Sequence, residues 1–214
     1  MNLKIKKSVI DGFNTLKDNP IVLLVGLIYG ILVKLLEPGN LPIYDGANLR
    51  LFDSIYVEGI NLTAIILLGI FINGLIIVLS AKGKKFSITA AVKLVASRYP
   101  TILFAYILTF IINALGLLAF VVPGIFLSIK LLYFEQAILL NGKGAVESLK
   151  MSWNVSRGNW WRVFALVLLI SLISLMIVFP VNFFDRHIAD FVASSLIVPF
   201  VAASYTKSYL QLKR

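Results

Sequence analysis

Hydrophobic residues fall into six long runs that short polar segments separate. The runs cover about residues 20–36, 60–80, 100–122, 124–141, 160–179 and 191–205. A transmembrane helix needs roughly 20 apolar residues to cross the hydrocarbon core, and most of these runs approach that length. The pattern therefore predicts an all-α integral membrane protein with six transmembrane helices, and it places a tight turn at Pro123–Gly124 between the third and fourth runs.

Three basic segments precede the first, third and fifth runs. They cover residues 3–17, 81–99 and 142–157, and each has apolar residues at helical spacing on one side and lysines or arginines on the other. In the first segment, Ile5, Val9, Phe13 and Leu16 share one face. This pattern is typical of amphipathic helices that lie in the plane of a membrane surface.

Composition supports a bilayer as the solvent. Hydrophobic residues make up 59% of the 214 residues and charged residues 14%, whereas soluble domains are nearer half apolar and a quarter charged. With a net charge of +10, the protein is then expected to contact anionic lipid headgroups at the inner face, and we expect no nucleic-acid partner. The chain has no cysteine, which excludes disulfides and thiolate metal sites.

Charge distribution predicts the orientation. With the N-terminus in the cytoplasm, 16 of the 20 lysines and arginines fall on the inner side. Cytoplasmic loops of membrane proteins carry such an excess. We therefore expect a multi-pass protein of the cell (plasma or inner) membrane with both termini cytoplasmic.

A short pattern recurs in the second and third basic segments with the same spacing. The first copy is Gly83, Lys84, Ser97 and Arg98, and the second is Gly142, Lys143, Ser156 and Arg157. Within a single membrane domain covering 1–214, this predicts three repeat units at 1–80, 81–141 and 142–214, each an in-plane helix followed by a membrane hairpin. The alternative is that the basic inner loops of a six-span protein match by chance.

Chemistry-bearing motifs are scarce. The chain has one histidine and contains no HExxH, G-x-S-x-G or P-loop sequence. We expect no catalytic residue, no metal site and no cofactor, and hence a protein that is not an enzyme.

Two ionisable residues lie inside the fourth run. Lys130 and Glu135 are costly in a bilayer, so they should face a partner or water, with Asn73, Thr109 and Asn113 as polar neighbours from the second and third runs. Lys130 and Glu135 are five residues apart, about 140° around a helix, so they should not pair directly. The alternative is that Lys130 extends to the headgroups while Glu135 is protonated or caps a neighbouring helix.

Further candidates lie at the predicted inner interface and in the first run. Arg157, Trp160, Trp161 and Arg162 suit either lipid headgroup binding or ordinary anchoring of a span. In the first run, Gly26 and Gly30 form a small-xxx-small pattern that predicts close helix packing.

Residues 112–170 carry a family resemblance. Leu115–Ile125 (LGLLAFVVPGI), Lys130, Asn141–Trp153 (NGKGAVESLKMSW) and Ser156–Val163 (SRGNWWRV) resemble the membrane domain associated with glycerophosphodiester phosphodiesterases and its stand-alone uncharacterised prokaryotic relatives. The resemblance implies a membrane architecture. The 214 residues contain no counterpart of the soluble phosphodiesterase domain, so we expect that its activity does not transfer.

Three functions are then open. The first is a non-enzymatic protein that handles or transports lipid, or a small amphipathic molecule, through a polar site in the helix bundle. The second is a scaffold or assembly factor for other membrane proteins, with a membrane-protein partner or a second copy of this chain as its ligand. The third, which the sequence supports least, is a membrane enzyme that acts on phospholipid.

Overall fold

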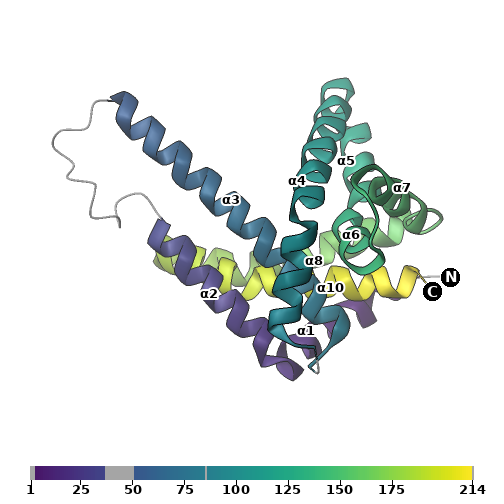
Figure 1. The fold of residues 1–214 in the computed structure, drawn as a ribbon, viewed down its shortest axis with the longest axis horizontal. Helices are drawn as coiled ribbons and strands as arrows, with labels where there is room; N and C mark the ends of the chain where they lie inside the picture. Colours follow the sequence, from purple (N-terminus) through teal and green to yellow (C-terminus); the bar gives the residue numbers. More distant parts are fainter. Residues whose placement is uncertain (1–2, 37–50, 85, 214) are drawn as a thin grey trace.

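A computed structural model describes residues 3–36, 51–84 and 86–213, and every regular element in these ranges is a helix (Figure 1). Much of the polar loop that follows the first hydrophobic run lies outside them. The helices are α1 (Ile5–Asp18), α2 (Pro20–Leu36), α3 (Leu51–Lys82), α4 (Ile88–Ala119), α5 (Val121–Leu131), α6 (Phe134–Asn141), α7 (Ala145–Val155), α8 (Trp160–Phe184), α9 (Arg186–Val192), the π-helix η1 (Ala193–Ile197) and α10 (Val198–Leu212).

Five helical segments of the described chain are long and apolar enough to cross a membrane. The segments are Gly59–Lys82, Ile88–Ala119, Val121–Asn141, Trp160–Phe184 and Arg186–Leu212. A sixth is reached only if α1 and α2, which meet at 86°, count together as one broken span. The all-α prediction with several membrane-length helices is therefore confirmed, while the number of spans is five or six.

The junction of α1 and α2 forms a sharp elbow at Asn19. Helix α2 begins at Pro20, as the sequence predicts, because proline is tolerated in the first turn of a helix. Helix α1 buries the small residues Ser8 and Gly12, and a Cβ at Gly12 would overlap Ser204 on α10. Phe13 and Leu16, which were predicted to share the membrane-facing apolar side, differ in burial: Phe13 is 62% exposed, whereas Leu16 is buried within the protein. Close packing on α10 therefore determines which face of α1 is buried.

Helix α4 is continuous, and this corrects the predicted division into an in-plane helix at 81–99 and a span from Pro100. Pro100 lies inside the helix without ending it. Contacts with α3 support the same turn, because the Tyr99 hydroxyl donates to the Leu67 carbonyl at 2.7 Å and the Tyr99 ring packs on Phe71. Tertiary packing here outweighs the local effect of proline.

The turn between α4 and α5 lies at Phe120, three residues before the predicted Pro123–Gly124 turn. Phe120 is extended, with φ −170° and ψ 155°. Pro123 falls in the first turn of α5, where its missing N–H is harmless. Gly124 is used for packing, since a Cβ on the facing Gly116 would lie 3.1 Å from the Gly124 Cα.

The core lies where α3, α4, α6 and α10 meet. Ile76, Ile102, Ile138 and Tyr209, one from each helix, are fully buried. Figure 1 shows α3 and α4 diverging from this region, with α10 running across it and the two chain ends close together.

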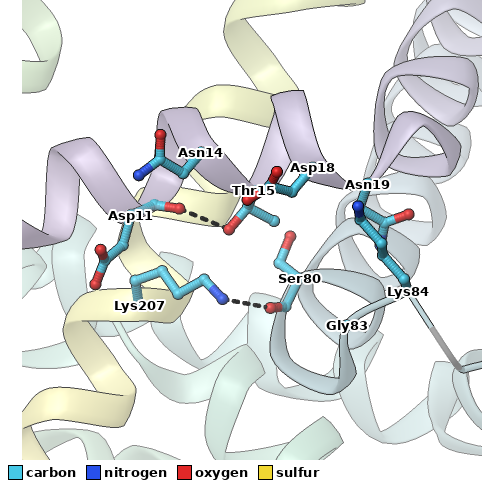
Figure 2. Close-up of a pocket in the computed structure, with 9 residues that line it drawn as sticks. All are labelled: Asp11, Asn14, Thr15, Asp18, Asn19, Ser80, Gly83, Lys84 and Lys207. Carbon is cyan, nitrogen blue, oxygen red and sulfur yellow. Dashed lines mark hydrogen bonds between the residues drawn. The ribbon is translucent and has the colours of Figure 1, made fainter.

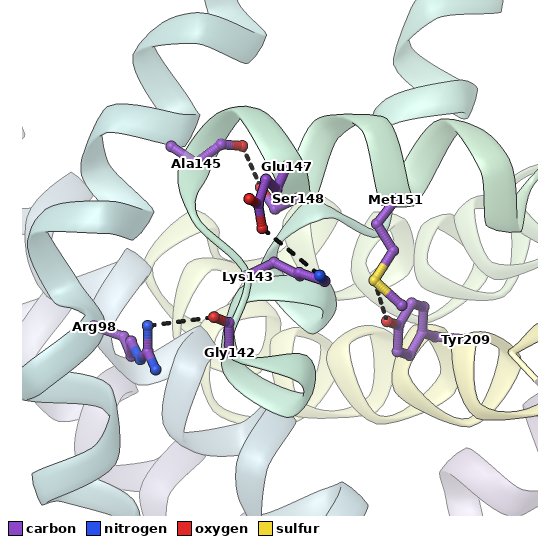
Figure 3. Close-up of polar contacts among 8 residues, drawn as sticks. All are labelled: Arg98, Gly142, Lys143, Ala145, Glu147, Ser148, Met151 and Tyr209. Carbon is purple, nitrogen blue, oxygen red and sulfur yellow. Dashed lines mark hydrogen bonds and ion pairs between the residues drawn. The ribbon is translucent and has the colours of Figure 1, made fainter.

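Helix α7, the third predicted in-plane helix, folds back along α6. Gly142 ends α6 in a left-handed conformation at φ +65°, and Arg98 of α4 donates to its carbonyl at 3.5 Å (Figure 3). Lys143 and Glu147 form an ion pair of 3.7 Å in the first turn. The Tyr209 hydroxyl donates to Asn141 at 2.7 Å, which ties this end of α6 to α10.

Three serines lie on the buried side of α7 and at its C-terminal end. Ser148, Ser152 and Ser156 recur every four residues and are all fully buried. Ser152 bridges the break between α5 and α6, because its hydroxyl accepts from the Tyr133 N–H at 2.9 Å and donates to the Lys130 carbonyl at 2.8 Å. Helix α7 therefore satisfies the backbone groups that the break leaves without a partner within α5 and α6.

Candidate functional site

A cavity of about 290 Å³ lies between α3, α4, the α5–α6 region and α10. Three of the five polar residues predicted for the bundle interior, Asn73, Thr109 and Glu135, line it. Most of the remaining wall is apolar. The complete lining is Asn73, Tyr106, Thr109, Ser128, Leu131, Leu132, Phe134, Glu135, Gln136, Val201, Ala202 and Tyr205.

Glu135 of α6 is contacted by side chains from two other helices, α3 and α4. It lies in the first turn of α6, the end at which a helix favours an acidic group, and is 5% exposed. Its Oε2 accepts a hydrogen bond from the Asn73 amide on α3. The Tyr106 side chain of α4 lies beside the same carboxyl group, and its ring packs edge-on against Phe134 at 4.9 Å.

Several buried polar atoms at this cavity have no protein partner among the described residues. They are Glu135 Oε1, Gln136 Oε1 and Thr109 Oγ1. Buried polar groups are nearly always hydrogen bonded, so such atoms call for a ligand or water. Because two of the three are oxygen atoms of carboxyl and amide groups, the cavity is suited to a group that donates hydrogen bonds.

Asn113 and Lys130, the other two predicted interior residues, lie elsewhere. Asn113 has a buried Oδ1 without a partner but does not line the cavity. Lys130 is 6% exposed, and its Nζ lies 5.2 Å from the ring centre of Trp153 and 5.6 Å from that of Phe126. It makes cation–π contacts, in keeping with the expectation that it does not pair with Glu135.

The four residues predicted to bind lipid headgroups lie at and near the start of α8, where Trp160 joins Phe126 and Trp153 in an aromatic cluster. Trp160 stacks on Phe126 at 5.5 Å and on Phe164 at 5.3 Å, and its indole N–H donates to the Phe126 carbonyl at 3.3 Å. Trp161 is 74% exposed. Arg157 is exposed and Arg162 is half-buried. Trp160 and Trp161 line an apolar groove of about 480 Å³ that is open to the protein surface, whereas Arg157 and Arg162 do not line it.

Gly26 and Gly30 face the C-terminal helices. A Cβ at Gly26 would overlap Pro199 and the Ser195 carbonyl oxygen. A Cβ at Gly30 would lie 3.0 Å from the Ser195 Cβ and 3.2 Å from the Phe191 ring. Both glycines therefore let α2 pack closely against η1 and the helices that flank it.

Sequence reasoning missed four polar residues of the cavity: Tyr106, Ser128, Gln136 and Tyr205. One signal was available, because Tyr106, Thr109 and Asn113 are spaced three and four residues apart and so share one face of a helix. Tyr205 comes from α10, and no local pattern connects it with Glu135.

Within residues 3–36, 51–84 and 86–213, no group of three histidine, cysteine or acidic side chains is placed to hold a metal ion. Residues 55–212 match the family described as "Domain of unknown function (DUF7847)". The chain belongs to this family. Comparison with curated proteins and with solved structures finds no match.

The DUF7847 match includes the segments on which the family resemblance rests, together with every residue that lines the Glu135 cavity. The match carries no link to glycerophosphodiester phosphodiesterase-associated domains, so that resemblance stays a prediction. Helix α1 and α2, with Gly26 and Gly30, lie before the matched residues.

Proposed function

We propose that this protein binds a lipid or small amphipathic molecule inside the membrane and moves it through the cavity around Glu135. The observation that carries the proposal is the Glu135 carboxyl group itself: it is buried, one of its oxygens has no partner among the described residues, and it faces a cavity lined by both polar and apolar side chains. An amphipathic ligand matches such a lining, because its polar head can donate to the free oxygen while its apolar part contacts the leucine, valine and alanine side chains.

The size of the cavity restricts the ligand. About 290 Å³ is at the lower end of small-molecule pockets, which is enough for a headgroup but not for a whole lipid. Only the headgroup and the methylene groups next to it would then enter the cavity, and the rest of the acyl chains would remain outside, among the exposed apolar side chains of the membrane-length helices. The proposed event is passage of a headgroup through the bundle, and no reaction is proposed.

The proposed setting is the cell membrane with both termini cytoplasmic. Hydrogen bonds between the N-terminal segment and α10 support a location of both termini on the same side of the membrane. The Lys4 N–H donates to Gln211 at 3.2 Å, and Gln211 donates to Ser8 at 3.1 Å. The resemblance to the phosphodiesterase-associated membrane domain belongs to the same proposal, and it suggests an association with phospholipid without supplying an activity.

Glu135→Gln tests the proposal. We expect proteoliposomes with the natural protein to speed the transbilayer movement of phosphatidylethanolamine that carries a fluorophore on one acyl chain, measured by dithionite quenching. Glu135→Gln should slow this movement about tenfold, because it replaces one carboxyl oxygen with an NH2 group that cannot accept the ligand's hydrogen bond, a loss of about 1.4 kcal/mol.

The matched control is Glu147→Gln, which changes the same residue type at an exposed position on α7. It should leave the rate unchanged. A Glu135→Gln protein that moves the probe as fast as the natural one would refute the proposed function.

A further inference from the structure

A second polar pocket, of about 320 Å³, lies at the α1–α2 elbow. We call it the elbow pocket; it is formed by the last turns of α1 and α3 together with Lys207 of α10 (Figure 2). The Lys207 Nζ donates to the Ser80 carbonyl at 2.9 Å, and so satisfies a carbonyl in the last turns of α3. The elbow pocket shares no residue with the cavity around Glu135.

Two buried side chains of the elbow pocket have polar atoms without partners in the described chain. Asn19 is 3% exposed, and neither its Nδ2 nor its Oδ1 is hydrogen bonded. Ser80 is 1% exposed, and its hydroxyl is also unpartnered. Figure 2 shows both around the same space. Together these atoms can donate and accept, so a matching ligand must bring acceptors as well as donors.

The charges of the elbow pocket are balanced. Two lysines, Lys84 and Lys207, oppose two carboxylates, Asp11 and Asp18. A purely anionic group would leave the carboxylates unpaired, and a purely cationic group would leave the lysines unpaired. A quaternary ammonium is also unsuited, because it has no N–H to donate and no aromatic side chain lines this pocket.

We propose that the elbow pocket binds a zwitterionic headgroup that carries a phosphate and a primary amine. The phosphate accepts from Lys207, Ser80 and Asn19, and the amine donates to the carboxylates. The same chemistry is offered by phosphatidylethanolamine in the bilayer and by soluble phosphoethanolamine. The proposal does not rest on transport through the Glu135 cavity.

Native mass spectrometry of the detergent-solubilised protein tests this assignment, with dioleoyl phosphatidylethanolamine, phosphatidylcholine and phosphatidylglycerol as probes. We expect phosphatidylethanolamine to bind at least fivefold more tightly than the other two. Ser80→Ala removes one hydrogen-bonding group and should weaken phosphatidylethanolamine binding about fivefold. Asn19→Ala removes two such groups and should weaken it about tenfold.

Ser87→Ala, at an exposed serine outside the pocket, is the matched control and should leave binding unchanged. Weaker binding in Ser80→Ala can be told apart from unfolding, because removing an unsatisfied buried hydroxyl should not lower the melting temperature of the lipid-free protein. Equal binding of the three lipids, or pocket variants that behave like Ser87→Ala, would overturn the proposal.

Two further arms separate the sources and the sites. Soluble phosphoethanolamine that displaces the lipid at similar concentration would identify the free molecule as the ligand, whereas failure to displace it would identify the lipid. In a protein that already carries Glu135→Gln, Ser80→Ala should still weaken phosphatidylethanolamine binding about fivefold, because the two sites share no residue. Loss of lipid movement in Glu135→Gln and loss of binding in Ser80→Ala are therefore independent results.

Discussion

Ser152→Ala should destabilise the protein by about 2–4 kcal/mol. The Ser152 hydroxyl satisfies both the Tyr133 N–H and the Lys130 carbonyl at the α5–α6 break, and all three residues are buried. Leaving a buried backbone group unpaired costs about 1–3 kcal/mol. The carbonyl keeps only a weaker contact with Ser156 at 3.4 Å. Thermal or SDS unfolding in detergent micelles would measure the loss.

Ser148→Ala is the matched control, one turn earlier on the same buried face. Its hydroxyl donates at 2.6 Å to the carbonyl of Ala145 within α7 and bridges no second helix (Figure 3). We expect a change of less than about 1 kcal/mol. Equal losses in the two variants would show that serine burial, and not the bridge, stabilises this region.

Gly26→Ala should destabilise the protein by roughly 1–3 kcal/mol, although alanine is the better helix former. The added methyl group would overlap Pro199 and the Ser195 carbonyl oxygen, and neither is the flexible end of a side chain. Overpacking of a close contact typically costs this much. Unfolding in detergent measures the loss of stability. Hydrogen exchange should also show that α2 detaches earlier than in the natural protein.

Gly59→Ala provides the comparison, because Gly59 is an exposed glycine within helix α3. No atom lies within 4 Å of the position that an added methyl group would occupy there. The change should be neutral or stabilising by about 0.5–1 kcal/mol, the usual gain for alanine over glycine in a helix. If Gly26→Ala behaves in the same way, α2 does not depend on the close approach to η1.

Helix type and the apolar segments followed from the sequence because hydropathy and proline placement are local properties. The start of α2 at Pro20 agrees with the prediction. Predictions that needed tertiary contacts were wrong. Pro100 does not end a helix because α3 supports that turn, and the α4–α5 turn lies at Phe120 because Gly124 is needed for packing.

The candidate site was predicted in part for the same reason. Glu135, Asn73 and Thr109 stand out as polar residues in apolar runs, and the structure places all three on one cavity. The elbow pocket gave no such signal, because Asn19 and Ser80 lie at the ends of apolar runs, where polar residues are ordinary. Only the 86° bend and the packing of α10 bring them together and bury them.

Pairing of the first two helices with the last ones also bears on biosynthesis. Helix α1 packs on α10 and α2 packs on η1, so their partners are made some 160–200 residues later. At 5–20 residues per second, the interval is on the order of ten seconds or more. During that time, the glycine face of α2 and the polar face of α1 stand uncovered in the nascent protein. Completion of this fold thus waits until η1 and α10 have been synthesised and have left the ribosome.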